Sequence, residues 1–126
     1  MKNETIKFTC PICGYKVFAE PPGSHDICPI CGWEDDVVQL RFVKLAGGAN
    51  KISLIEAQDN FRKNGIAKPH SSFISLLRQP IADDEKDTKW RIFDPSIDDI
   101  EVAEPRKEYG NTYPSRIEEL YYWRKL

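Results

Sequence analysis

The chain has 126 residues, of which 40% are hydrophobic and 30% charged, and its formal net charge is −2. This composition supports a modest core and excludes an intrinsically disordered chain. No apolar run reaches the length of about 18 residues that a membrane-spanning helix needs. The first residues lack the apolar stretch of a signal peptide, so we expect a cytoplasmic protein whose thiols stay reduced.

The chain begins with two candidate strands around a cysteine-containing turn. Residues 6–9 and 15–18 alternate apolar and polar side chains, which predicts two short antiparallel strands. The turn between them reads Cys-Pro-Ile-Cys-Gly at residues 10–14, and the same five letters recur at residues 28–32. We call these turns the first and the second knuckle.

The two knuckles predict one metal site. Each would point two sulfurs inward, with backbone N–H groups beside them and a glycine that permits the tight turn. Two such turns converge on a tetrahedral four-sulfur site, which accepts zinc or a single iron ion. We expect zinc rather than iron, in a closed site that stabilises the fold and does not catalyse. The predicted ligands are Cys10, Cys13, Cys28 and Cys31.

Helices are expected after the knuckles. Residues 37–45 fit a helix or a strand equally well. The clearest helix begins at Ser53, which forms a capping-box pattern with Glu56, and it ends at Gly65. A second short helix is expected at residues 71–78. Its predicted inward-facing residues are Phe73, Leu76 and Leu77.

The C-terminal third combines prolines with acidic clusters, so residues 80–113 are expected to be extended and partly irregular. We call this segment the C-terminal stretch. The residues expected to attach it to the core are Trp90, Ile92 and Phe93. A last helix is expected from about residue 114 or 115, with an aromatic face. The candidate partner-binding residues on it are Tyr121, Tyr122 and Trp123.

Together these elements predict an α+β chain. A small four-cysteine zinc ribbon of short antiparallel strands would occupy residues 1–36. A few helices and the irregular C-terminal stretch would follow in residues 37–126, packed as one unit with the ribbon.

Charge is distributed unevenly along the chain. Residues 1–40 carry three basic and six acidic side chains, residues 41–79 seven and two, and residues 80–126 eight and twelve. Four thiolates on a divalent ion would add negative charge to the ribbon, which disfavours phosphate binding there. The basic side chains of the middle segment are interpreted as scattered over the surface. They are Arg41, Lys44, Lys51, Arg62, Lys63, Lys68 and Arg78.

The acidic run at residues 34–36, with Asp26 close by, could bind a cation, but it is interpreted as a solvated helix N-terminus, where carboxylates favour the helix dipole. The acids between Asp83 and Glu104 have no metal-loop spacing and are interpreted as solvated as well.

The sequence resembles the bacterial cysteine-rich CPCC family over about residues 8–80. The likeness is carried by residues 10–15, 21–24, 27–36, 47–50, 53–61 and 65. One position departs, because Ile12 stands where the family has an additional cysteine. The resemblance implies a zinc ribbon joined to a short helical segment, and it implies no reaction.

These patterns favour some classes of function and disfavour others. The sequence contains no nucleophile elbow, phosphate loop or catalytic acid pair at recognisable spacing, so we expect no enzyme. The leading hypothesis is a non-enzymatic zinc-binding protein that binds another protein, one form of which is an immunity or antitoxin-like protein. The alternatives are a nucleic-acid-binding zinc ribbon and a rubredoxin-like iron protein for electron transfer. The rest of the chain lacks the Glu-x-x-His helices of rubrerythrins, whose tail the ribbon resembles.

Overall fold

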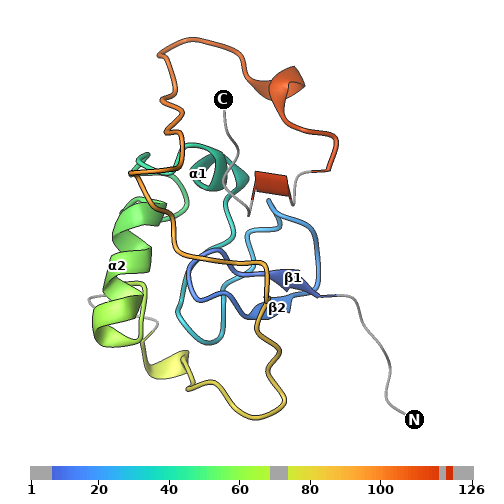
Figure 1. Cartoon of the computed structure of the whole chain (residues 1–126), viewed down its shortest axis with the longest axis vertical. Coiled ribbons are helices and arrows are strands. Elements are labelled where there is room, and N and C mark those ends of the chain that lie inside the picture. Colours follow the sequence, from blue (N-terminus) through green and yellow to red (C-terminus); the bar gives the residue numbers. More distant parts are fainter. Residues whose placement is uncertain (1–6, 69–73, 117–118, 121–126) are drawn as a thin grey trace.

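The computed structural model describes residues 7–68, 74–116 and 119–120. It shows a small α+β fold, as the sequence predicts, in which a short two-stranded sheet lies beside two helices (Figure 1). No described helix is both long enough and apolar enough to cross a membrane. The predicted division of the chain after residue 36 stays a prediction.

Both predicted strands are present, and they are short. Strand β1 (Phe8–Thr9) pairs antiparallel with β2 (Lys16–Phe18), with a register irregularity between the two residues of β1. The second knuckle is enclosed by a single antiparallel bridge between Ile27 and Glu34. Each knuckle therefore lies at the tip of a small hairpin.

Helix α2 (Leu54–Asn64) confirms the clearest sequence prediction. The Ser53 hydroxyl accepts a hydrogen bond from the Glu56 N–H at 3.2 Å, which satisfies one of the free donors of the first turn. Gly65 adopts the left-handed conformation, with φ of 76°, and its N–H donates to the Phe61 carbonyl. Local sequence chemistry therefore determines both ends of this helix.

Helix α1 (Val37–Arg41) resolves the ambiguous segment. The Asp36 carboxylate accepts from the N–H groups of Val38 and Gln39 through one oxygen. Its other oxygen accepts from Ala49 N–H at 2.9 Å. A helix of five residues has little stability of its own, so this cap and the Ala49 contact decide its conformation.

The prediction that residues 34–36 are solvated is wrong for two of the three. Asp35 and Asp36 are both buried. The Asp35 carboxylate accepts from the N–H groups of Gly23 and Ser24 and from the Ser24 hydroxyl, so it holds the loop before the second knuckle. Burial raises the pKa of Asp35, and the hydrogen bonds from Ser24 and Gly23 oppose that shift.

A buried amide pair organises the loop after α1. The Gln39 side-chain carbonyl accepts from the N–H and the amide group of Asn50, at 3.0 and 2.9 Å. The Asn50 side chain in turn bonds to both backbone groups of Glu34. These contacts place the Gly-Gly-Ala-Asn loop against the exit of the second knuckle.

The C-terminal stretch crosses the first hairpin as an irregular chain (Figure 1). Lys16 N–H donates to the Glu85 carbonyl, and Asp87 N–H donates to the Gly14 carbonyl, both at 2.8 Å. Phe93 is buried and Trp90 packs against the core, as predicted. Ile92 does not follow the prediction, because its side chain is exposed.

The remaining helix predictions are only partly met. In the described part of the helix expected at 71–78, residues 74–78, a single 3-10 turn spans Ile74–Leu76, and Leu76 is 73% exposed instead of facing inward. Leu77 does pack inward, over Gly32, whereas Phe73 lies outside the described residues.

At the C-terminal end, a 3-10 turn spans Gly110–Thr112, and residues 115–116 form a bend where the last helix was expected to start. Leu120 is buried. The predicted partner-binding residues lie outside the described part of the chain. They are Tyr121, Tyr122 and Trp123.

Candidate metal centre

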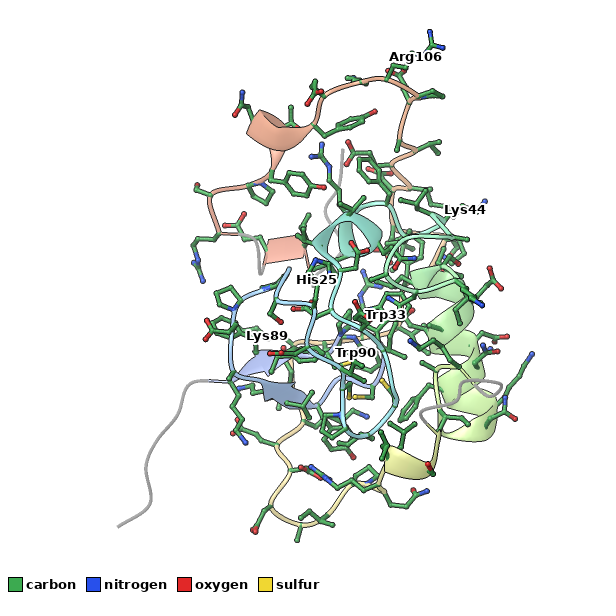
Figure 2. The ribbon with its side chains drawn as sticks, turned by 180° about the vertical axis from the view of Figure 1, so that it is seen from behind. His25, Trp33, Lys44, Lys89, Trp90 and Arg106 are labelled. Atoms are coloured by element: carbon green, nitrogen blue, oxygen red, sulfur yellow. The ribbon has the colours of Figure 1, made fainter. Side chains whose placement is uncertain are left out.

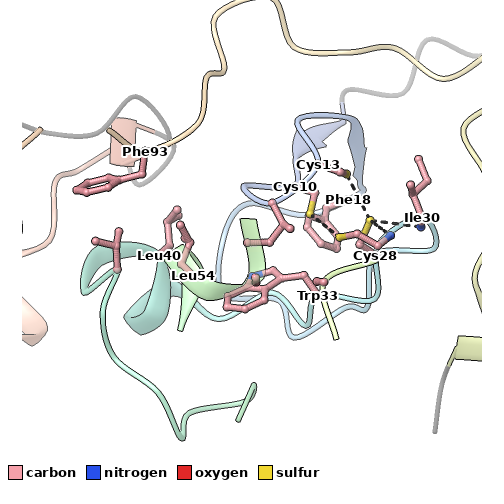
Figure 3. Packing of buried hydrophobic residues seen from close by; sticks show 14 of the residues in the cluster. Cys10, Cys13, Phe18, Cys28, Ile30, Trp33, Leu40, Leu54 and Phe93 are labelled. Carbon is pink, nitrogen blue, oxygen red and sulfur yellow. Dashed lines mark hydrogen bonds between the residues drawn. The ribbon is translucent and has the colours of Figure 1, made fainter. Parts of the chain in front are cut away.

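The structure brings the four predicted ligand sulfurs together. They all lie within 4.8 Å of one another, with 3.5 Å between those of Cys10 and Cys31 and 3.8 Å between those of Cys13 and Cys28 (Figure 3). Sulfurs that bind one ion tetrahedrally at about 2.3 Å lie about 3.8 Å apart. The sulfurs are much farther apart than the roughly 2.05 Å of a disulfide bond, and all four cysteines are free. These residues could therefore hold one metal ion.

The two knuckles share one backbone pattern. In each, the N–H of the first cysteine donates to the carbonyl five residues later, and the glycine N–H donates back to the first cysteine's carbonyl, at 2.9 to 3.0 Å. Gly14 and Gly32 both have positive φ angles, of 79° and 88°. Identical local sequences thus produce turns with the same hydrogen bonds, and each turn contributes two sulfurs to the site.

The thiols are buried and lie close enough to one another to shift each other's pKa. Burial raises the pKa of Cys10 and Cys31, whereas hydrogen bonds from the neighbouring thiols, chiefly Cys10, lower the pKa of Cys28. The N–H groups of Ile30 and Cys31 also approach the Cys28 sulfur at 3.4 Å. An ion that binds here must displace thiol protons, so metal binding and proton release are coupled.

The centre is part of the hydrophobic core. Each of the four cysteines is at most 1% exposed. Trp33, Leu54 and Phe18 pack in the same cluster (Figure 3). A four-sulfur site enclosed in this way leaves an ion no open position for a substrate or water, which is the property of structural metal sites.

Helix α2 and the C-terminal stretch meet at one carbonyl of the first knuckle, that of Pro11. Pro11 accepts from the Gln58 amide at 2.9 Å and from the Trp90 indole N–H at 2.8 Å. The Gln58 carbonyl accepts from Phe93 N–H. Gln58 was not among the predicted site residues, and its one local signal is a polar side chain within the apolar stripe of the helix.

The second knuckle is held by different segments. Ala67 N–H donates to the Cys31 carbonyl at 2.8 Å, and Arg78 N–H donates to the Pro29 carbonyl at 2.9 Å. Leu77 covers Gly32. The residues after α2 therefore return to the metal centre and close its other side.

Replacing Gly14 by alanine is expected to destabilise the first knuckle. A Cβ atom there would lie 2.5 Å from Cε3 of Trp90, and the φ angle of 79° is unfavourable for any L side chain. Gly47→Ala is the matched control, because Gly47 also has a positive φ, of 86°, with nothing within 4 Å. Thermal unfolding should show a clearly larger loss for Gly14→Ala than the roughly 1 kcal/mol expected from φ alone. Equal losses of stability in Gly14→Ala and Gly47→Ala would show that the Trp90 ring does not hinder a side chain at position 14.

Several basic residues of the middle segment form ion pairs with carboxylates. Arg41 is buried in an ion pair with Glu101, and Arg78 pairs with Asp84 at 2.7 Å. Arg62 and Lys63 both pair with Asp59 on the same helix. Lys44 points outward at the periphery of the molecule (Figure 2). A phosphate backbone would therefore find much of the positive charge of this segment already compensated.

Many acids of the last third are likewise engaged within the molecule, contrary to the expectation that they are solvated. Arg91 pairs with Asp98, whose carboxylate is buried, and Thr9 donates to Asp87 at 2.7 Å. The Arg78 guanidinium lowers the pKa of Asp84 to about 2. The acidic composition of this segment therefore overstates the negative charge that it offers to a partner.

The family model described as Cysteine-rich CPCC matches residues 8–87, as the resemblance predicted and slightly beyond it. The additional residues include the Glu85–Asp87 segment, which bonds to the first hairpin. No curated protein matches the chain.

Proposed function

The chain belongs to the cysteine-rich CPCC family, and we propose on this basis that it binds one zinc ion through Cys10, Cys13, Cys28 and Cys31. The observation that carries the proposal is the convergence of four buried sulfurs within 4.8 Å of one another. Zinc prefers four thiolate ligands in a closed tetrahedral site. When bound, zinc would supply cross-linking between the two knuckles and no chemistry toward a substrate.

Iron could occupy the same sulfur set, because an iron site with four cysteines has the same ligand type. We favour zinc because the sequence lacks the Glu-x-x-His helices that accompany rubredoxin-like tails in rubrerythrins. A colourless purified protein with one equivalent of zinc is the expected result, and stoichiometric iron with visible absorbance would contradict it.

We further propose that the protein is not an enzyme and that its zinc-stabilised fold binds another protein. Support comes from large apolar side chains on the described surface. Leu76 and Ile81 are 73% and 58% exposed, and they flank Leu77 and Arg78, which contact the second knuckle. Exposed apolar groups held on a rigid support are typical anchors of protein interfaces.

The immunity or antitoxin-like form of this proposal requires an adjustment. Several acids of the last third already pair with Arg41, Arg78 and Arg91. We therefore place the contact on the apolar loop, residues 74–84, rather than on the acidic composition of the last third. Nucleic-acid binding is the less favoured alternative, because several of the basic side chains are paired with carboxylates. Binding to DNA or RNA that survives about 150 mM salt would revive it.

Native mass spectrometry and metal analysis of the protein purified from its own host test both parts of the proposal. The expected result is one zinc ion per chain and a stoichiometric complex with a second protein. Leu76→Asp combined with Ile81→Asp should abolish the complex and leave the zinc content unchanged, since neither side chain is a ligand. Val102→Asp is the matched control, because Val102 is similarly exposed on a different loop. A protein that stays uncomplexed under these conditions would count against the partner role and leave the metal site intact.

A further inference from the structure

Lys68 lies beside the second knuckle and differs from several other basic residues of the middle segment in its partner. The preceding residue, Ala67, donates its N–H to the Cys31 carbonyl at 2.8 Å. The Lys68 ammonium donates to the side-chain carbonyl of Asn50 at 3.0 Å. This partner is a neutral amide, whereas a carboxylate pairs with each of four other basic residues, Arg41, Arg62, Lys63 and Arg78.

The Asn50 contact directs Lys68 toward the exit of the second knuckle. The same Asn50 carbonyl accepts from the N–H of Glu34, which follows Cys31 by three residues. Burial lowers the pKa of Lys68, while the negative charges of Glu34 and Cys31 raise it. The ammonium therefore lies within electrostatic reach of a predicted ligand sulfur, in a partly buried position where screening by solvent is weak.

A buried site of four thiolates needs a positive charge nearby. Four thiolates on one divalent ion carry a net charge of −2, and a buried net charge is costly unless it is compensated. The N–H groups of Ile30 and Cys31 offer only partial positive charge to the Cys28 sulfur. Arg78 also lies near Cys28, but its guanidinium is already bound by both oxygens of Asp84.

We propose that Lys68 is the counter-charge of the metal centre, where its ammonium offsets the negative charge at Cys31, strengthens metal binding and lowers the reactivity of the bound thiolates. The inference rests on the proposed zinc site and assigns a positioning role to a residue outside the ligand set. Lys68 would act through the electrostatic potential at the sulfurs, without binding the ion.

The test compares zinc-loaded wild type with Lys68→Gln, Lys68→Arg and Lys44→Gln. Glutamine keeps a hydrogen-bond donor for Asn50 but has no charge, and arginine keeps the charge. Lys44 is an exposed lysine of the same segment and serves as the control. Zinc transfer to a chromophoric chelator reports the affinity. Mass spectrometry after iodoacetamide treatment reports the rate of thiolate alkylation.

Lys68→Gln is expected to weaken zinc binding by about tenfold, the order expected for removing one charge beside a partly buried anion. It should also accelerate alkylation severalfold. Lys68→Arg should stay within about twofold of wild type in both measurements. Lys44→Gln should match wild type. Lys68→Met is a second neutral variant for use if Lys68→Gln fails to fold when loaded with zinc.

Wild-type zinc affinity and alkylation rate in both neutral variants would overturn the inference. Equal impairment of Lys68→Gln and Lys68→Arg would overturn it too, because side-chain shape and not charge would then matter. Either result leaves the zinc site standing if wild type retains one equivalent of zinc. A wild-type protein without bound zinc would instead show that the proposed function itself has failed.

Discussion

Replacing Cys28 by serine is expected to unfold the N-terminal ribbon. The Cys28 sulfur is near that of Cys13 and accepts from the N–H groups of Ile30 and Cys31. Structural zinc contributes on the order of 10 kcal/mol to small metallo-domains, which is comparable to the whole stability of a typical domain, about 5 to 15 kcal/mol. Because β1 and β2 contain five residues between them, the sheet cannot replace that contribution.

Circular dichroism melting with and without zinc measures this effect. Cys10→Ser should behave in the same way, and wild type treated with a strong chelator should reproduce the loss. Lys44→Ser, at an exposed position at the periphery of the molecule, is the control and should melt like wild type. If Cys28→Ser and wild type have the same melting curve, the prediction that the metal stabilises the fold is wrong.

Replacing Arg41 by alanine is expected to release the end of the C-terminal stretch from α1. The Arg41 side chain is 4% exposed and bonds to both Glu101 oxygens, at 2.9 and 2.8 Å. It also donates to the Thr112 hydroxyl and lies 4.5 Å from the Tyr113 ring centroid. The Glu101 carboxylate raises the pKa of Arg41, so the arginine is charged at all ordinary pH values. Removing one partner of such a buried pair costs about 3 to 5 kcal/mol.

Hydrogen exchange followed by mass spectrometry locates this effect. In Arg41→Ala, amides of residues 101–113 should exchange faster, while those of the knuckles should keep their wild-type protection. Arg41→Lys should give an intermediate result, because lysine keeps the charge but cannot form the two parallel bonds to Glu101. Unchanged exchange in residues 101–113 would show that other contacts hold this segment.

The Arg41 contact also has a bearing on the family match. The match ends at residue 87, whereas Glu101 and Thr112 lie beyond it. Arg41 belongs to the matched region and binds the part of the chain that the family model does not cover. Changes in the last third would therefore alter a segment that this arginine attaches to α1.

The features that could be predicted from the sequence have causes that lie within a few consecutive residues. The knuckles follow from the Cys-Pro-Ile-Cys-Gly spacing, since the glycines permit the turns that direct the sulfurs inward. Helix α2 follows from Ser53 at its start and Gly65 at its end. Each of these signals acts through hydrogen bonds between near neighbours, so no knowledge of the fold was needed.

Other features depend on residues far apart in the chain, and these required the folded structure. Residues 37–45 fit two patterns, and α1 forms because Asp36 caps it while also binding Ala49. Gln58 and Trp90 were not recognisable as supports of the first knuckle, because the Pro11 carbonyl that they share lies 47 and 79 positions away.

The pairing of charges could not be predicted from the sequence either, because it also depends on residues far apart in the chain. Composition gives the number of acids and bases, but Coulomb interactions depend on which of them the fold brings together and how far it buries them. Arg41 and Asp98 belonged to apparently solvated sets until folding buried each beside an opposite charge. Lys68 looked like any surface lysine, and only the Ala67–Cys31 and Lys68–Asn50 contacts place it at the metal centre.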